Sequence, residues 1–229
     1  MTASAVGRGR VTQGRVSALL RYQLSLLLRS QRWLPPVLFY ALLLVAGWFG
    51  GQQYGDSLGW CAGMLVPVCA WLTRTATSAE PDAARSVVAA AVGARTARGA
   101  MLAVALGCGL LLGAVGGAFE VATSSAPIGP HAPIATIVQD GLVAVLVGVL
   151  AGTALGALPI RGRAAGALAL TAGSLGLLVL AGSPVNAAVR QTFTSGQLYA
   201  VTSLPWLALV EAVALLAVCA VVAVRAESS

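Results

Sequence analysis

The sequence EPDAARSVVAAAVGARTARGA, from Glu80 to Ala100, is a polar interval between two long apolar runs. Pro81 suits the first turn of a helix, and Asp82 places a negative charge where a helix N-terminus favours one. Gly93 follows as a signal for the end of a helix. The interval therefore predicts a short helix over residues 81–92.

This predicted helix has one apolar side. Its apolar residues recur at i, i+3, i+4, i+7 and i+8 and so share one stripe, formed by Ala84, Val87, Val88, Ala91 and Val92. The other side carries Asp82, Arg85, Ser86 and Ala89. A helix of this length is too weak to fold alone. We therefore expect it, with Glu80 before it, to be a docking element for a soluble partner.

The composition indicates the class of protein. The chain has 229 residues, of which 58% are hydrophobic and 9% charged. Several apolar runs approach the roughly 20 residues that a helix needs to cross a bilayer. The formal net charge of +7 then reports topology rather than nucleic-acid binding, because basic residues concentrate on the cytoplasmic face of membrane proteins. The cysteines all lie inside apolar runs and predict small buried side chains: Cys61, Cys69, Cys108 and Cys219.

The N-terminal residues are basic and divide into two parts. Residues 1–14 are rich in Gly, Ser, Thr and Arg and predict a disordered cytoplasmic tail. Residues 15–33 predict an amphipathic helix in the membrane interface, whose polar stripe faces lipid phosphates and contains Arg21, Ser25, Arg29 and Arg32. The alternative is a basic flank that only orients the first span.

The rest of the chain, residues 34–229, predicts an all-α membrane domain of six spans. The apolar segments are residues 34–50, 58–73, 99–119, 135–158, 164–182 and 204–224. Pro35 and Pro36 should bend the chain into the bilayer, and Pro67 makes the second span short and broken. GVLAG and GTALG, within residues 148–156, place small residues four apart, as close helix packing requires. Residues 183–203 predict a short outer helix or a re-entrant piece.

The distribution of arginine predicts the topology. Thirteen of the 14 basic residues fall in or beside the predicted inner segments, 1–32, 74–98, 161–163 and 225, against Arg190 alone outside. The chain has no lysine and is dominated by Ala, Gly, Val, Leu and Arg, which indicates a GC-rich bacterial genome. We therefore expect a multi-pass protein of a bacterial plasma membrane with both termini in the cytoplasm.

The sequence predicts no catalytic site. A phosphate-binding loop of the form GxxxxGK[ST] requires a lysine, which this chain lacks. His131 stands alone in a predicted outer loop, GSLG at 173–176 departs from GxSxG, and no HExxH cluster occurs. We therefore expect no enzyme activity and no cofactor bound by this chain.

The layout resembles the permease subunit of a type-2 ABC exporter. The shared features are a basic interfacial helix, six spans with both ends inside, a cytoplasmic helix between spans two and three, and a short outer helix before span six. The residues that match the pattern of the cytoplasmic helix are Glu80, Val87, Val88, Arg95 and Arg98. The helix is rich in Ala and Val where the family has Leu, and Gly93-Ala94-Arg95 lacks the family's proline.

The resemblance implies a complex of two permeases and two ATPases. ATP and Mg²⁺ would bind to a separate ABC ATPase subunit, and the second permease would be another copy or a similar chain. Closure of the ATPase pair would pull on the helix at 81–92 and on the interfacial helix, and the spans would rock to open a path. Membrane lipids are the remaining expected partner.

Three acids lie in the predicted outer half of the membrane: Glu120, Asp140 and Glu211. Because a carboxylate in a span is costly, we expect these residues to face the interior of the bundle, where they could contact a cationic substrate. The alternative is a structural role, as a pair with Arg190 or as a protonated acid bonded to a neighbouring helix. Two other functions stay open: a secondary transporter, for which no inverted repeat is evident, and a non-transporting membrane scaffold.

Overall fold

The computed structural model describes residues 3–49, 53–126, 132–160, 162–197 and 206–225. Within these ranges the chain is all-α, apart from one isolated bridge between Gln53 and Ser125. The described helices are α1 (Ala3–Ser30), α2 (Leu34–Phe49), α3 (Tyr54–Ser78), α4 (Asp82–Val92), α5 (Ala94–Thr123), α6 (Ile134–Gly156), α7 (Arg163–Val179), α8 (Pro184–Gln197) and α9 (Trp206–Arg225).

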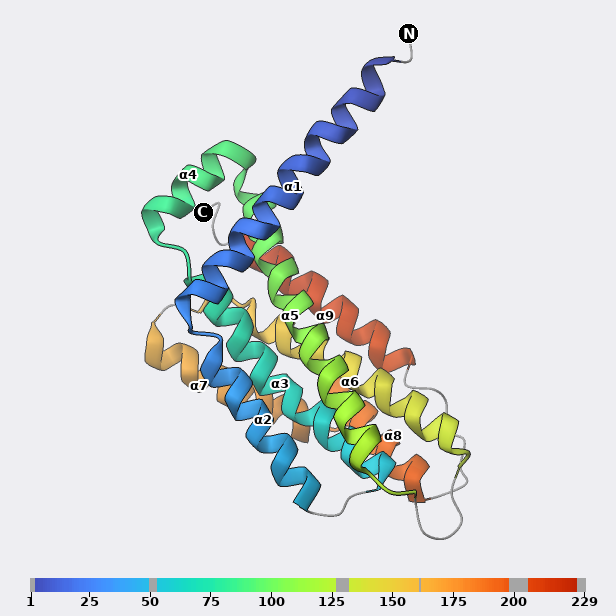
Figure 1. Ribbon diagram of the computed structural model, residues 1–229. Coiled ribbons are helices and arrows are strands. Elements are labelled where there is room, and N and C mark those ends of the chain that lie inside the picture. The colour runs from blue at the N-terminus through green and yellow to red at the C-terminus, as the bar shows by residue number, and fades with distance from the viewer. Residues whose placement is uncertain (1–2, 50–52, 127–131, 161, 198–205, 226–229) are drawn as a thin grey trace.

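The helices form an elongated bundle with two different ends (Figure 1). One end carries the N-terminal part of α1, all of α4 and the end of α9, and the other carries the ends of α2 and α5 with the beginnings of α3 and α6. We call the first the basic end, because it holds Arg21, Arg29, Arg74, Arg85, Arg95 and Arg225. The second is called the opposite end.

The packing of α6 against α3 forms the centre of the bundle. Three glycines one turn apart on α6 lie against successive backbone carbonyls of α3. An added Cβ would overlap the carbonyl oxygen of Ala62 at Gly148, of Val66 at Gly152 and of Ala70 at Gly156. Small residues at this spacing let two backbones approach closely without help from a hydrophobic driving force. The close packing predicted from GVLAG and GTALG is therefore confirmed.

Helix α3 is enclosed by other helices. It contacts α1, α2, α5, α6, α7 and α8, and most of its residues between Gly55 and Ala76 are buried. The helix continues through Pro67 without a break, which corrects the predicted broken span. Neighbouring helices can satisfy the backbone groups that a proline leaves unpaired in a membrane helix.

The described helices make this a multi-pass membrane protein by length and hydropathy. Three are long and apolar enough to cross a bilayer: Ala94–Thr123, Ile134–Gly156 and Trp206–Ala223. The number rises to five if two bent pairs each form one span, Val16–Ser30 with Leu34–Phe49 and Ala164–Val179 with Pro184–Thr194. Helix α3, which contains predicted span 58–73 and the charged residues Asp56 and Arg74, is not among these candidates.

The chain bends by 75° between α1 and α2. The bend lies at Gln31, whose φ of 53° ends α1 in a left-handed conformation, and the Trp33 indole N–H donates to the carbonyl oxygen of Leu28 at 3.2 Å. Pro35 and Pro36 lie in the first turn of α2, where a proline fits without loss of a helical hydrogen bond. The predicted bend therefore occurs, but the prolines follow it rather than cause it.

Two further predicted segments, residues 1–14 and 183–203, compare differently with the structure. Helical backbone in α1 begins at Ala3, so positions 3–14, predicted as a disordered tail, continue the helix that follows them. Extension of an existing helix adds one hydrogen bond for each residue that is fixed, which is easier than starting a helix. At the other position, the helix predicted after Pro184 is confirmed as α8, and α7 and α8 meet at 46°. Residues 198–205 lie outside the described ranges.

Candidate functional site

Helix α4 begins one residue after the predicted position 81 and ends at the predicted Val92. It runs from Asp82 to Val92, after Pro81 in an extended conformation with φ of −60° and ψ of 146°. Gly93 then adopts φ of 87°, a conformation that favours glycine, and α5 begins at Ala94. One glycine therefore separates the predicted docking helix from the candidate span that follows it.

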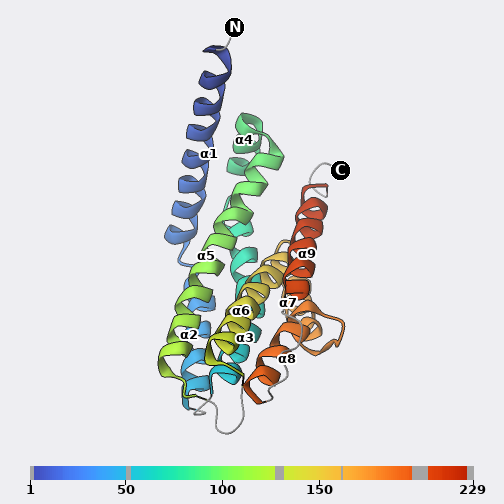
Figure 2. The same ribbon diagram turned by 90° about the vertical axis from the view of Figure 1, so that its right-hand side faces the viewer.

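Helix α4 projects from the bundle at the basic end (Figure 2). Among the described helices it packs against α5 and no other. Of its apolar stripe, Val87 is 68% exposed and Ala91 is exposed, whereas Ala84, Val88 and Val92 are half-buried. The stripe is thus covered on one edge by the protein itself and uncovered on the other edge, at Val87 and Ala91.

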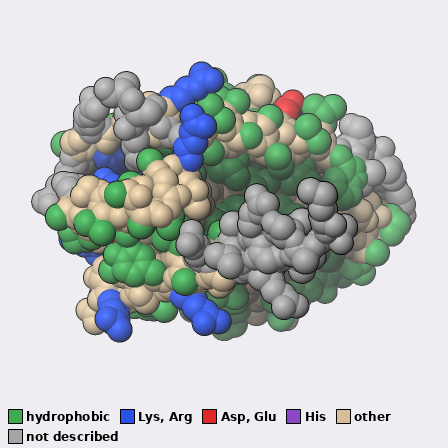
Figure 3. All heavy atoms as spheres, turned by 90° about the horizontal axis from the view of Figure 1, so that it is seen from above, with side chains coloured by type: hydrophobic (Ala, Val, Ile, Leu, Met, Phe, Trp, Pro, Cys, Tyr) green, Lys and Arg blue, Asp and Glu red, His purple; other side chains and the backbone are tan. Residues whose placement is uncertain are grey.

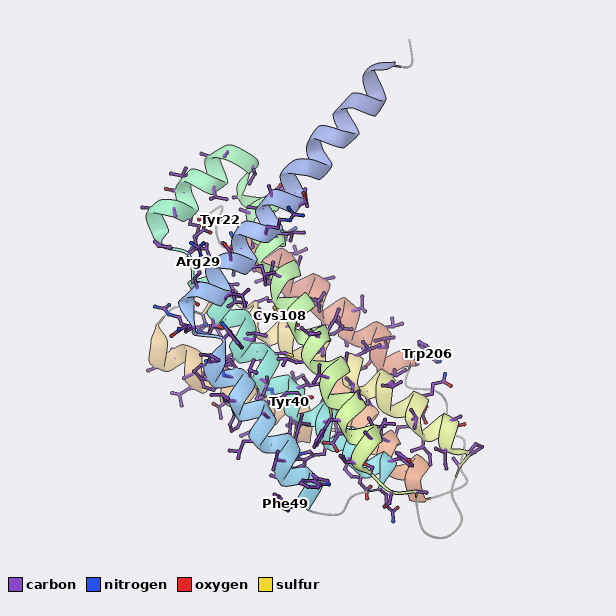
Figure 4. All side chains as sticks on the ribbon, viewed as in Figure 1. Tyr22, Arg29, Tyr40, Phe49, Cys108 and Trp206 are labelled. Atoms are coloured by element: carbon purple, nitrogen blue, oxygen red, sulfur yellow. The ribbon has the colours of Figure 1, made fainter. Side chains whose placement is uncertain are left out.

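Glu80, directly before α4, lies inside the protein. It is only 2% exposed, and its carboxylate accepts hydrogen bonds from the Tyr22 hydroxyl at 3.2 Å and from Nε2 of Gln23 at 3.3 Å. Both donors belong to α1, where Figure 4 labels Tyr22. We call these three residues the α1–α4 clasp. Its geometry means that Glu80 holds α1 to the start of α4 rather than facing a soluble partner.

Arg85 connects α4 to the end of α3. Its Nη2 donates to the carbonyl oxygen of Thr77 at 3.4 Å and to that of Glu80 at 3.1 Å. Thr77 lies in the last turn of α3, where carbonyl groups lack helical partners and a cation is favourable. Arg85 therefore fixes the angle at which α4 leaves α3. The side chain of Asp82 lies outside the described part of the structure.

The predicted arginine stripe is on the surface: Arg21 and Arg29 on α1, and Arg32 just after it, are all exposed. The side of α1 that packs on the bundle is formed by Leu19, Gln23 and Leu27, which are buried and one turn apart. Val16, Leu24 and Leu28 are more than one-third exposed. An exposed apolar stripe beside exposed arginines is typical of a helix that lies at a membrane surface.

The three predicted membrane acids divide into two kinds. Glu120 is 1% exposed and Asp140 is 4% exposed, and within the described structure Oε1 of Glu120 and Oδ1 of Asp140 have no hydrogen-bond partner. Glu211, in contrast, is exposed on α9. The expectation that Glu211 faces the interior is therefore corrected, because the side of α9 that packs inward carries the small residues Ala208 and Ala212.

Polar side chains also contact one another near the opposite end and inside the bundle. The Ser124 hydroxyl donates to the Ser57 hydroxyl at 2.6 Å, and Tyr40, labelled inside the bundle in Figure 4, lies 3.1 Å from the thiol of Cys61. An added Cβ at Gly116 would overlap the Tyr40 hydroxyl. The described residues contain no group of three or more His, Cys, Asp or Glu side chains placed to hold a metal ion. His131 lies outside the described ranges.

Comparisons with known proteins leave the family open. No family model, no curated protein and no solved structure matches this chain. The geometry of the chain itself is therefore the basis for any function that we assign to it. That geometry offers an exposed helix at the basic end, held by polar contacts, and two buried carboxyl groups near the opposite end.

Proposed function

We propose that this chain is the membrane-spanning permease subunit of an ATP-driven ABC exporter, and that α4 docks on a separate ATPase subunit. The observation that carries the proposal is α4: an amphipathic helix that projects at the arginine-rich end, with Val87 68% exposed. Val87 and the exposed Ala91, one turn further along, form an uncovered apolar edge on this helix, which a partner protein would cover. Phosphate-binding chemistry would belong to that partner, because this chain has no lysine.

The proposal includes six spans, with α3 as the sixth. Helix α3 has 25 residues and is about 37 Å long, which exceeds the roughly 30 Å of the hydrocarbon core. Asp56 and Arg74 are half-buried near the two ends of α3, and most residues between them are buried against other helices, so the composition of α3 does not need to be as apolar as that of a lipid-exposed span. With α3 counted, both termini would lie on one side, and the start of α1 and the end of α9 lie at the same end of the bundle in Figure 1.

The contacts of α4 suggest how a movement would reach the spans. A push on α4 passes through Arg85 to the end of α3 and through Glu80 to α1, since these side chains hold the connection between α3 and α4. Helix α4 also continues into α5 across Gly93 alone. Three helices that enter the bundle would therefore move together with α4, as a rigid-body transition between two arrangements requires.

The experiment compares two charge substitutions one residue apart on α4. The tagged chain is purified from its host with an ATP-hydrolysing protein that carries GxxxxGK[ST], and the affinity of the pair is measured. We expect Val87→Asp to weaken binding at least tenfold, because it places a charge in the proposed contact. Ser86→Asp adds the same charge on the other side of α4 and should change the affinity less than twofold.

Three results would contradict parts of the proposal, and the first two would point to the open alternatives. Proton-driven transport by the purified chain without any ATPase would indicate a secondary transporter. Absence of transport, with or without nucleotide, in a correctly folded and fully associated preparation would indicate a scaffold. Equal effects of Val87→Asp and Ser86→Asp would place the ATPase contact away from the apolar edge of α4.

A further inference from the structure

The outer side of α9 carries a carboxylate within an apolar surface. Glu211 is exposed and is the charged residue of the candidate span Trp206–Ala223. It is the sixth residue of α9 and therefore lies about 8 Å along the helix axis from its start. Nearby side chains are apolar and uncovered, since Leu207 is 72% exposed and Val210 is 68% exposed. A carboxylate in contact with lipid tails is costly, so we expect a polar partner on this side of α9.

Helix α8 carries the opposite charge beside α9. Arg190 is the charged residue of α8 and is exposed. The two helices contact each other, and both pack on α6 (Figure 2). Their buried sides are apolar and are formed by Val185 and Ala188 on α8 and by Ala208 and Ala212 on α9. Arg190 and Glu211 therefore lie on the outer sides of two neighbouring helices.

The two charges are not paired within the chain. Among the described residues, no ion pair involves the side chain of Arg190 or that of Glu211. Residues 198–205 connect the two helices and lie outside the described ranges. This connection contains no Asp, Glu, Lys, Arg or His. A cation and an anion on one surface are thus available to a second molecule.

We propose that two copies of the chain meet in the membrane through the outer sides of α8 and α9. In an interface with a two-fold axis, every contact between two different residues occurs twice. Arg190 of each copy then pairs with Glu211 of the other copy, and all four charges are neutralised away from lipid. This interface follows from the multi-pass fold and does not depend on the proposed ATPase partner.

The distribution of charge and of exposed surface favours a second copy. Lipid tails on this surface would leave the Glu211 carboxylate unpaired. The charged side chains visible at the basic end are mostly arginines (Figure 3), so two copies that met there would repel each other. In addition, only 22% of residues 206–223 in α9 are buried within the chain, against 33% and 56% in the apolar stretches of α5 and α6. Helix α9 thus offers the most uncovered surface of these three candidate spans.

The test measures association of the full chain in lipid vesicles without any ATPase. Two populations carry a donor or an acceptor fluorescent protein at the C-terminus, and energy transfer is measured as the ratio of protein to lipid is lowered. Glu211→Arg places two cations at both copies of the contact, and Arg190→Glu places two anions there. Because like charges across an interface are strongly unfavourable, each variant alone should associate with itself at least tenfold more weakly than the unmodified chain.

Mixing the two variants separates a contact between copies from a contact within one chain. In a mixed pair, the arginine introduced by Glu211→Arg faces the glutamate introduced by Arg190→Glu, and the second contact keeps its original residues. We therefore expect the mixed pair to associate within threefold of the unmodified chain. Mixing cannot restore a pair within one chain, so a mixed pair no tighter than either variant alone would overturn the proposal.

Ala118→Arg is the matched control for a charge added to a span. Ala118 is exposed on α5, five residues before that helix ends at Thr123, just as Glu211 lies five residues after α9 begins. This variant should change self-association less than twofold, and a loss equal to that of Glu211→Arg would overturn the proposal. Energy transfer in the unmodified chain no greater than random crowding predicts would also overturn it and would show that lipid covers this side of α9.

Discussion

The contact between α3 and α6 and the contact of α1 with Glu80, two residues before α4, are built in opposite ways. In the first, Gly148, Gly152 and Gly156 lie directly against backbone carbonyls, so the two helices have no space to shift. In the second, a few side-chain hydrogen bonds, centred on Glu80, join elements that otherwise contact little. A backbone contact holds one distance, whereas long polar side chains can keep their bonds through a change of angle.

The difference assigns different tasks to the two regions. A tightly packed pair of helices has few alternative arrangements and moves as a unit. An element with few buried apolar contacts opens at low free-energy cost and can change position. We therefore expect the α3–α6 contact to be the rigid frame of the molecule, and α4 with the adjoining part of α1 to be the region that responds to a partner.

The largest effect is expected from a bulky side chain in the α3–α6 contact. Gly152→Leu places a side chain where the carbonyl of Val66 and Cβ of Cys69 already lie, and overpacking of this kind should cost about 3 kcal/mol or more. Equilibrium unfolding in mixed micelles measures the loss. Gly107→Leu on α5, with no atom within 4 Å of the added Cβ, is the matched control. Equal stability of the two variants would show that the α3–α6 contact is not the rigid region.

An intermediate effect is expected from the α1–α4 clasp. Glu80→Ala removes the acceptor for the Tyr22 hydroxyl and for the buried Gln23 amide, at a cost of about 2 kcal/mol. Hydrogen exchange should increase in residues 15–30 and 82–92 and stay unchanged in residues 58–76. Glu80→Gln keeps one carbonyl oxygen as an acceptor, so its hydrogen exchange in residues 15–30 and 82–92 should lie between that of the unmodified chain and that of Glu80→Ala. An increase spread evenly over the chain would mean that the clasp belongs to the rigid frame.

The smallest effect on stability is expected at the exposed middle of α4. Because Val87 is 68% exposed, Val87→Asp should change the free energy of unfolding of the isolated chain by less than about 0.5 kcal/mol. Thermal unfolding in detergent, in the absence of any partner, checks this. A loss above about 1 kcal/mol would show that Val87 packs on the chain itself. Weaker binding of the ATPase by Val87→Asp could then be explained by a change in the fold.

The sequence predicts local features of this molecule well. The start of α4 near Pro81, its end at Gly93 and the small-residue contact of α6 all depend on neighbours within a few turns, so the pattern of residues contains them. Hydropathy is a weaker guide to α3, because a helix enclosed by other helices can carry Pro67 and Arg74 and still be central. A count of apolar residues reports contact with lipid rather than position in the bundle.

The candidate site depends on contacts that the sequence does not reveal. Glu80 and Gln23 are 57 residues apart, and no local pattern predicts that one accepts a hydrogen bond from the other. Arg85 falls on the polar side of the predicted helix, but its guanidinium turns back to the end of α3. The exposure of Glu211 was equally hidden, because the cost of a carboxylate in a span gives no information on which side of α9 packs inward.

The most direct test of the account is a photocrosslinker at position 87 of the full chain in its native membrane. The account predicts an adduct with a protein that carries GxxxxGK[ST], formed at position 87 and absent when the crosslinker replaces Arg190 at the opposite end. The yield of this adduct should be lower with ATP present than without it, because ATP binding would change the contact between α4 and the ATPase. A crosslink at position 87 to lipid alone, or labelling of this position from outside intact cells, would contradict the assignment of α4 as the docking helix.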